Sequence, residues 1–202
     1  MPVALTCLWL LLASASAETP ADPAAMMRDL ARCRVVTADF VQTRRLAGMD
    51  MAVEITGSMV FERGGRLRWQ VDAPVRSVTV IERDKLTHFD AESGKLAVIR
   101  QETFPWMKVL RDSLDDWLAG DPKRFEGRFT VTSPGPHTLR LVPCEETLKK
   151  LYRSVEIELA PDGGSIAAVR LEENTGDRLE IRFLKVKNDP ELPQTIWRMP
   201  PE

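Results

Sequence analysis

Apolar and polar residues alternate along most of this chain, as they do in strands that bury one face. The alternation begins at Val36, Ala38 and Phe40. Its later apolar positions are Val53, Ile55, Met59 and Phe61; Leu67, Trp69 and Val71; Val78 and Val80; Phe129 and Val131; Leu139 and Leu141; Val155, Ile157 and Leu159; Val169 and Leu171; and Leu179, Ile181 and Phe183. This pattern predicts about five strands, a helical interruption, and about five more strands. Strands of this kind favour an antiparallel sheet, and a sheet this wide must curl or close.

Two segments have the spacing of helices instead. Asp22-Pro23 is typical of an N-cap followed by proline at the first helical position, and it predicts a helix that runs to about Cys33. The buried side of that helix would carry Met26, Met27, Leu30 and Ala31. Between Phe104 and Ala119, apolar residues recur every three or four positions, which predicts one or two short amphipathic helices.

The predicted fold class is therefore α+β, mainly β. The few helices can cover only part of the concave side of the sheet. Asp162-Gly163 and the stretch 174–177 predict hairpin turns between later strands. The tail from Asp189 to Glu202 is expected to be a loop with one short extended piece at Thr195–Arg198.

The chain opens with an uncharged stretch. Its apolar core, Leu8–Ala13, is followed by Ala15-Ser16-Ala17, small residues of the kind that a signal peptidase reads. We interpret residues 1–17 as a cleaved signal peptide and residues 18–202 as a single domain. A membrane anchor, the alternative, would need about 20 apolar residues. Cys7 lies before the apolar run ends, so lipidation of this residue is not expected.

Composition narrows the range of partners. The formal net charge of −2 argues against nucleic acid. Eight Met and five Trp against a single Tyr suggest an adaptable apolar interior, because methionine packs around irregular shapes. After removal of the leader, Cys33 and Cys144 could form one disulfide or remain separate thiols, and the sequence leaves both possibilities open.

Candidate catalytic and metal-binding residues are sparse. A hydrolytic triad needs a base, and the two histidines, His88 and His137, each lie alone near a predicted strand end. A metal site needs several ligands at a recurring spacing, whereas Asp115-Asp116 and Glu145-Glu146 are adjacent pairs that we expect to be solvated. We therefore expect no enzymatic activity, no cofactor and no metal.

A set of short motifs follows the first predicted helix. The motifs are Phe40-x-Gln42, Gly57-x-Met59-x-Phe61, Arg63, Leu67-Arg68-Trp69, Pro74 and Phe89-Asp90. With the helical segment at 104–119, they resemble the periplasmic lipoprotein carriers of the LolA family, which place lid helices at that point. The resemblance covers most of the mature chain, and its specific motifs lie between residues 36 and 90.

The resemblance implies an incomplete barrel, in which a strongly curved antiparallel sheet has helices as a lid over its apolar concave face. It implies a soluble periplasmic carrier that sequesters the acyl chains of lipoproteins in an apolar cavity and moves them from the inner membrane towards the outer membrane. The expected partners are the acylated cargo, an inner-membrane transporter and an outer-membrane acceptor, with no nucleic acid, and the protein is expected to be a monomer.

Two departures from the family pattern stand out. In the family an Arg after the second strand latches the lid, and Arg63 is the matching residue. Family members often have Pro next, where this chain has Gly64-Gly65, so its turn is less constrained. The tail after the last strand is also shorter than is typical of these carriers, which would suit a different acceptor or cargo.

The expected lining of the acyl cavity comes from the apolar faces of the strands and of the helical segment. It comprises Phe40, Ile55, Met59, Phe61, Leu67, Trp69, Val71, Trp106, Met107, Leu110, Trp117, Ile181 and Phe183. Each of these alone also suits an ordinary core. Arg66 and Arg68 alternate with Leu67 and Trp69, so we expect them to point outward, towards an acidic partner, lipid phosphates or solvent.

Two other functions fit the same pattern. One is a carrier of another envelope lipid or lipid-like product. The other is a periplasmic regulator that senses lipid; such regulators usually carry a second domain, for which we expect no room in this chain.

Overall fold

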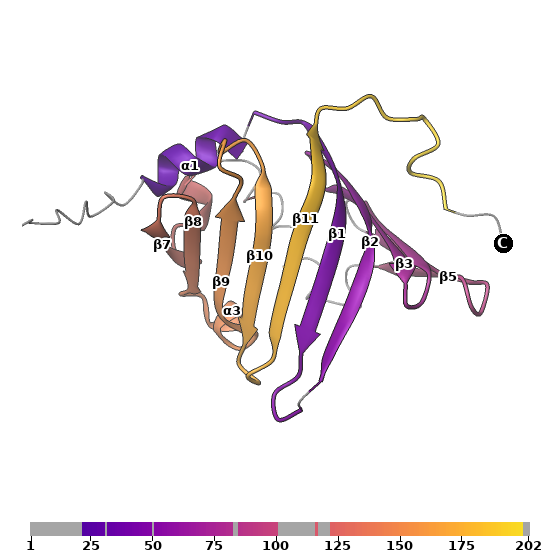
Figure 1. Cartoon of the computed structure of the whole chain (residues 1–202), viewed down its shortest axis with the longest axis horizontal. Helices are drawn as coiled ribbons and strands as arrows, with labels where there is room; N and C mark the ends of the chain where they lie inside the picture. The colour runs from indigo at the N-terminus through magenta and orange to yellow at the C-terminus, as the bar shows by residue number, and fades with distance from the viewer. Residues whose placement is uncertain are drawn as a thin grey trace, which may run out of the picture.

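A single antiparallel sheet dominates the structure, a computed structural model that describes residues 22–30, 32–49, 51–82, 85–100, 116 and 122–199 (Figure 1). Its 11 strands lie in the order β6-β5-β4-β3-β2-β1-β11-β10-β9-β8-β7. The strands are β1 (Val35–Arg45), β2 (Ala52–Glu62), β3 (Arg66–Ala73), β4 (Ser77–Glu82), β5 (Lys85–Asp90), β6 (Lys95–Arg100), β7 (Phe129–Gly135), β8 (Thr138–Pro143), β9 (Tyr152–Leu159), β10 (Ile166–Glu173) and β11 (Arg178–Asn188). The described helical elements are α1 (Pro23–Leu30), η2 (Pro122–Phe125) and α3 (Glu146–Lys149).

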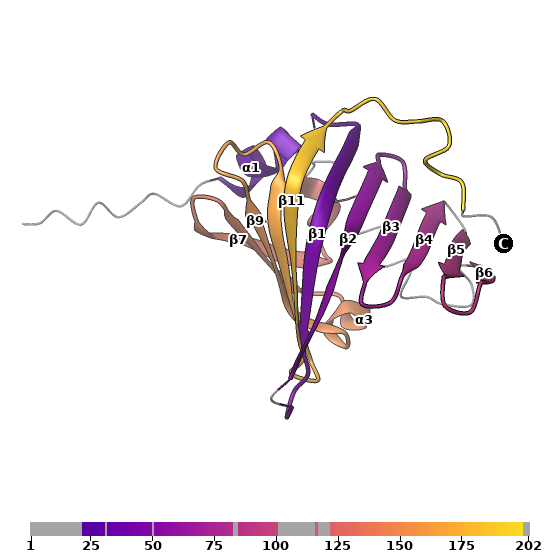
Figure 2. The same cartoon turned by 45° about the vertical axis from the view of Figure 1, so that its right-hand side comes forward.

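The sheet consists of two halves joined at its centre. Strands β1–β6 lie side by side in chain order, and β7–β11 do the same. The pairing of β1 with β11, from Val36↔Asn188 to Arg45↔Arg178, joins the halves. The outermost strands of the sheet are therefore β6 and β7, which are neighbours in the sequence. This is a curved open sheet, as the fold prediction required (Figure 2).

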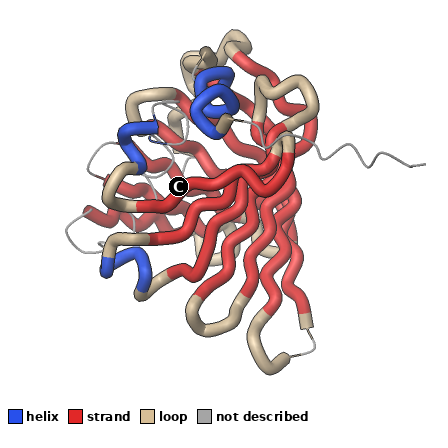
Figure 3. The backbone as a smooth tube through the Cα atoms, turned by 90° about the vertical axis from the view of Figure 1, so that its left-hand side faces the viewer, coloured by secondary structure: helices blue, strands red, loops and turns tan. Residues whose placement is uncertain are grey.

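The two faces of the sheet differ in what lies on them. Met27 of α1, Phe125 of η2 and Leu148 of α3 belong to one buried cluster with strand residues such as Ile157 and Val169. We call this the inner face, and the short helical elements lie to this side of the long strands (Figure 3). The opposite, outer face of β9–β11 carries charged side chains.

Ion pairs connect neighbouring strands on the outer face. Arg170 of β10 donates through Nη2 to Glu158 of β9 at 2.7 Å and through Nε to Glu180 of β11 at 3.0 Å. These side chains are about half exposed, so each ion pair adds little to the stability of the fold. Their presence shows that this part of the outer face is polar.

Helix α1 begins where the sequence predicted a helix, but it ends earlier than predicted. The Asp22 carboxylate accepts a hydrogen bond from Ala24 N at 3.0 Å, as expected of an N-cap. The helix ends at Leu30 rather than at about Cys33. From Val35 onward the chain is extended and pairs with β2 and β11. The amides of Arg34 and Val35 donate to the carboxylate of Asp189, which is near the other end of the chain, at 2.8 Å.

Strand β6 and the orientation of β4 correct the sequence interpretation. The stretch that forms β6, Lys95–Arg100, contains four apolar residues in succession, so it lacks the period of two and was not predicted. Val78 and Val80 of β4 were expected on the same face as the other apolar positions. They lie on the outer face, yet they are only 7% and 2% exposed. Because β4 is buried on both faces, its alternation does not reveal which face is inner.

The tail forms a turn where an extended piece was expected. Ile196 N donates to Pro193 O at 3.0 Å and Arg198 N donates to Thr195 O at 2.9 Å. After β11 the tail passes over the end of β1 and towards β3 (Figure 1). The predicted hairpin turns are confirmed, with Gly163 and Gly176 at the positive φ values of 71° and 90° that such turns require.

Candidate functional site

The inner face of β1–β6 is the candidate site, and the strand register arranges it in rows. The first row holds Val36, Phe61, Leu67, Ile81, Leu86 and Ile99. The second row holds Ala38, Met59, Trp69, Thr79, His88 and Ala97. The third row holds Phe40, Gly57, Val71, Ser77, Asp90 and Lys95. Residues of one row lie directly opposite one another on adjacent strands, so all of them share one face.

The first row is a compact apolar cluster. Phe61, Leu67, Ile81 and Leu86 are buried, and Met59, Trp69 and Ile99 pack against them. The second and third rows are more open, since Met59, Trp69 and Val71 are only partly buried. Apolar surface therefore remains accessible on the inner face of β2 and β3.

Gly57 allows two aromatic side chains to meet on this face. Phe40 on β1 and Trp69 on β3 stack with ring centroids 3.9 Å apart, although β2 runs between their strands. A Cβ atom at Gly57 would lie 2.8 Å from Phe40 Cζ and 1.9 Å from the Gln70 carbonyl oxygen. Only glycine fits this position, so the motif around Gly57 serves the shape of the inner face.

Several of the predicted lining residues come together here. Phe40, Met59, Phe61, Leu67, Trp69 and Val71 share the inner face of β1–β3. Ile55 and Ile181 flank Gln42 on the same face, where β2, β1 and β11 meet. Phe183 lies opposite Phe40 but packs against the cluster of the other half. Trp106, Met107, Leu110 and Trp117 lie outside the described residues.

The other half of the sheet is filled by its own side chains. Met26, Met27 and Leu30 of α1 pack with Phe125 of η2 and with inner-face strand residues. Those strand residues include Phe129, Leu139, Leu141, Val155, Ile157, Leu159 and Val169. The described apolar surface that a ligand could reach is thus on the β1–β6 half.

Arg63 connects the turn after β2 to the segment between α1 and β1. Its Nη2 donates to Cys33 O at 3.0 Å, and its amide donates to Arg34 O at 2.9 Å. The lid that Arg63 was expected to latch lies outside the described residues. Cys33 is a free thiol, as is Cys144, and burial followed by the charge of Asp189 raises the pKa of Cys33.

Asp116 contradicts the expectation of a solvated Asp115-Asp116 pair for its own half of the pair, and Asp115 lies outside the described residues. Its carboxylate forms a short ion pair with Arg128 and lies 3.5 Å from Arg124, and its side chain is only 14% exposed. Arg128 also lies 3.6 Å from Glu145. Glu145 and Glu146, whose side chains are 45% and 80% exposed, do match the expectation. The difference arises because two arginines near the start of β7 surround Asp116, which the sequence spacing could not reveal.

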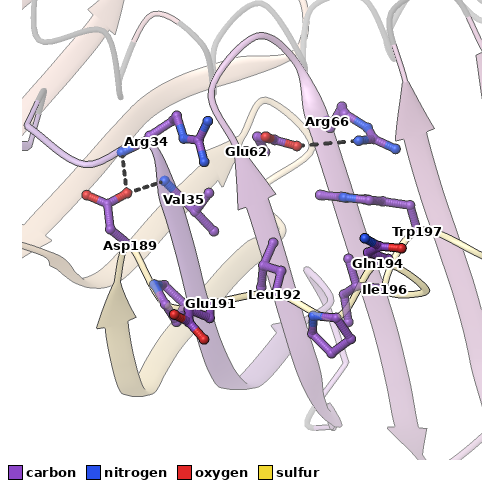
Figure 4. A pocket seen from close by; sticks show the side chains of 12 residues that line it. Arg34, Val35, Glu62, Arg66, Asp189, Glu191, Leu192, Gln194, Ile196 and Trp197 are labelled. Carbon is purple, nitrogen blue, oxygen red and sulfur yellow. Dashed lines mark hydrogen bonds and ion pairs between the residues drawn. The ribbon is translucent and has the colours of Figure 1, made fainter.

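A groove of about 390 Å³ lies on the outer face, beneath the tail (Figure 4). Its lining is formed by Arg34, Val35, Glu62, Arg66, Asp189, Pro190, Glu191, Leu192, Pro193, Gln194, Ile196 and Trp197. The guanidinium of Arg66 lies 4.2 Å from the Trp197 ring centroid and also contacts Glu82 at 2.9 Å. Arg68 donates to Arg198 O at 3.0 Å, and burial lowers the pKa of Arg68. This groove is mixed in polarity and lies on the face opposite the predicted acyl site.

Metal-binding clusters and membrane-spanning helices are both absent from the described residues. In the ranges that the structure describes, no group of three or more His, Cys, Asp or Glu side chains is arranged to hold a metal ion. Among the described helices, none is long and apolar enough to cross a membrane.

Comparison with known proteins places this curved sheet in a family. Residues 31–199 match the family model of the outer membrane lipoprotein carrier protein LolA, so the chain belongs to the LolA family. The outer-membrane lipoprotein carrier protein of Pseudomonas entomophila (strain L48) is 28% identical over 181 residues, covering 88% of this chain and 83% of that protein. The protein of the same name in Legionella pneumophila (strain Corby) is 21% identical over 169 residues, covering 83% and 80%.

Solved structures agree on the fold. An uncharacterized conserved protein from Thermus thermophilus matches with a TM-score of 0.54 at 9% identity, covering 90% of this chain and 96% of that chain. At this identity the likeness establishes a shared architecture and nothing about ligands.

Proposed function

We propose that this protein is a soluble periplasmic carrier that shields the acyl chains of lipoproteins and transfers them from the inner membrane towards the outer membrane. The observation that carries the proposal is the apolar inner face of β1–β3, which remains partly exposed at Met59, Trp69 and Val71 in a member of the lipoprotein carrier family. The relatives' shared name supplies the cargo class.

The energetics of hydrocarbon in water explain why such a carrier needs this face. Each buried methylene contributes about 0.8 kcal/mol, so an acyl chain of ordinary length would cost roughly 10 kcal/mol or more if it stayed in water. The carrier must also release its cargo, which favours an adaptable wall over a rigid one. The flexible side chain of Met59 beside the ring of Trp69 suits that need.

The remaining parts of the proposal follow the family resemblance. Residues 1–17 direct export and are removed, and the mature protein acts as a monomer. The segment at 104–119 covers the acyl chain with Trp106, Met107, Leu110 and Trp117, and Arg63 holds that cover. An inner-membrane transporter and an outer-membrane acceptor are the partners.

Ligand displacement tests this proposal. The purified mature protein should bind an apolar fluorescent probe and release it when a triacylated lipopeptide is added, whereas the same peptide without acyl chains should displace nothing. Trp69→Glu should weaken lipopeptide binding at least about tenfold, because the charge would have to be desolvated against hydrocarbon. Gln70→Glu, the matched control on the outer face, should bind normally. A protein from which no acylated ligand displaces the probe is not such a carrier.

The cargo can be identified directly. Native mass spectrometry of the protein isolated from the periplasm should show the mass of a triacylated lipoprotein. If the mass of an envelope lipid were found instead, the cargo would be that lipid rather than a lipoprotein, and the inner face would still be the binding site.

A further inference from the structure

Polar side chains gather at one corner of the otherwise apolar inner face. On β1, β2 and β3 all three rows are apolar or glycine. On the next three strands, passing from the first row to the third, the inner-face residues are Ile81, Thr79 and Ser77; Leu86, His88 and Asp90; and Ile99, Ala97 and Lys95. Polarity therefore rises towards the β6 edge and away from the first row, and a ligand lying on this face would meet hydrocarbon on one side and hydrogen-bonding groups on the other.

Thr79 and His88 form the innermost polar pair of this corner. Thr79 Oγ1 lies 2.9 Å from His88 Nδ1. Thr79 is directly opposite Trp69 in the second row, so the pair borders the accessible aromatic surface. The hydrogen bond holds the imidazole ring in one orientation and occupies one of its two nitrogens.

The second imidazole nitrogen of His88 is available. Among the residues that the structure describes, Nε2 has no hydrogen-bond partner. When the Thr79 hydroxyl donates to Nδ1, the proton of the neutral ring resides on Nε2, which can then donate to a ligand. The nearby Asp90 carboxylate accepts hydrogen bonds at Oδ1 from Ser93 N at 2.7 Å and from Ser93 Oγ at 2.6 Å, within the turn that leads to β6.

We propose that Thr79 and His88 form a polar subsite that binds the ester carbonyl through which an acyl chain is attached to its cargo. This inference rests on the proposed carrier function. A carbonyl oxygen only accepts hydrogen bonds, and it joins an apolar chain to a polar head, which is the combination that a single donor at the border of an aromatic surface recognises. The acyl chain would lie over Met59 and Trp69, and the head would point towards the β6 edge near Lys95.

A pair of ligands that differ only in the carbonyl tests the subsite. One is a peptide whose N-terminal cysteine carries a dipalmitoyl glyceryl group through ester bonds. The other carries the corresponding dihexadecyl group through ether bonds, with the same chain length and head. Wild-type protein should prefer the ester ligand about three- to tenfold, the range that one hydrogen bond accounts for.

Variants of the pair should bring the ratio of ester affinity to ether affinity towards one. His88→Leu deletes the donor, and Thr79→Val deletes the hydroxyl that orients it with little change in shape. His88→Gln keeps a side-chain N–H and should retain part of the preference. Thr87→Val, the matched control on the outer face of β5, should behave as wild type. Thr79→Val also keeps the test decisive if His88→Leu fails to fold.

The outcomes separate the subsite from the carrier function. Equal affinity of the wild-type protein for the two ligands, or an undiminished ester preference in His88→Leu or in Thr79→Val, overturns the subsite and leaves the carrier function standing. If the wild-type protein binds neither ligand, both the subsite and the carrier function are wrong.

Discussion

Phe40 on β1 and Trp69 on β3 are in direct stacking contact, with their rings 24° from parallel, across a strand that has no side chain between them. Phe40 is only 1% exposed, so this contact lies at the base of the inner face. Glycine in a strand interior weakens the strand by itself, and aromatic neighbours that cover it compensate. The three residues together shape the wall against which a ligand would lie.

Gly57→Ala should therefore destabilise the protein by about 1–3 kcal/mol, as overpacking of a filled interior does. The added methyl group meets the Gln70 carbonyl oxygen, which belongs to the backbone and cannot turn aside. Urea denaturation of the variant measures the loss. Gly135→Ala is the matched control, because a Cβ atom there meets nothing closer than 3.9 Å. Equal stability of the two variants would contradict the packing described above.

The stacked pair should show energetic coupling. In a double-mutant cycle of Phe40→Leu and Trp69→Leu, the interaction free energy should be about 1 kcal/mol, as for other aromatic pairs. Each change by itself removes the ring contact, so the double variant should lose less than the sum of the single variants. Strictly additive losses would mean that the two rings contribute independently. Chemical denaturation of all four proteins gives the answer.

Asp189 should make stability depend on pH in the acid range. Hydrogen bonds from the amides of Val35 and Arg34, in that order, lower the pKa of Asp189 in the folded protein. A carboxylate of lowered pKa stabilises fully above its unfolded pKa of about 3.9, and the stabilisation disappears as the pH falls through the folded value.

Asp189→Asn should consequently lower Tm at neutral pH and should approach the wild type as the pH falls below about 4. Thermal melts between neutral and acid pH measure this difference. Glu191→Gln removes a charge from the same tail without removing those hydrogen bonds, so its Tm should follow the wild type throughout. If the difference in Tm between Asp189→Asn and the wild type were the same at every pH, the charge of Asp189 would not be the cause of the difference.

Trp197 should hold the tail against the outer face. Its ring lies over the Arg66 guanidinium, and an interaction of this kind contributes about 0.5–1 kcal/mol at an exposed site. Trp197→Ala should speed hydrogen exchange at the amides of Ile196 and Arg198, whose bonds form the turn of the tail. Trp197→Phe keeps a ring and should exchange at a rate between the other two. Unchanged exchange in Trp197→Ala would show that other contacts hold the tail.

The period of two identified most of the inner face of β1–β3. Leu67 and Trp69 were assigned to one face because their neighbours in the sequence, Arg66, Arg68 and Gln70, are polar, and the register places them there. The same reasoning failed on β4, where Val78 and Val80 point outward. Alternation separates the two faces of a strand, and it cannot say which face is inner when both are buried.

The polar corner escaped the sequence analysis for a related reason. His88 was interpreted as an isolated residue near a strand end, because its partner Thr79 lies nine positions earlier in the chain. Only the pairing of β4 with β5 places the two side chains opposite each other. The groove beneath the tail was missed because its two walls come from opposite ends of the chain.

The sequence by itself determined the type of sheet, the strands with clean alternation, the hairpin turns at Gly163 and Gly176, and the family to which the chain belongs. The strands and turns are local properties, set by which residues are apolar and which tolerate a tight turn, whereas the family follows from short motifs between residues 36 and 90. The tertiary structure decided the pairing of β1 with β11, the inner face of β4, the surroundings of Asp116 and the course of the tail. Each of these depends on contacts between residues far apart in the chain, whose free energy no local pattern encodes.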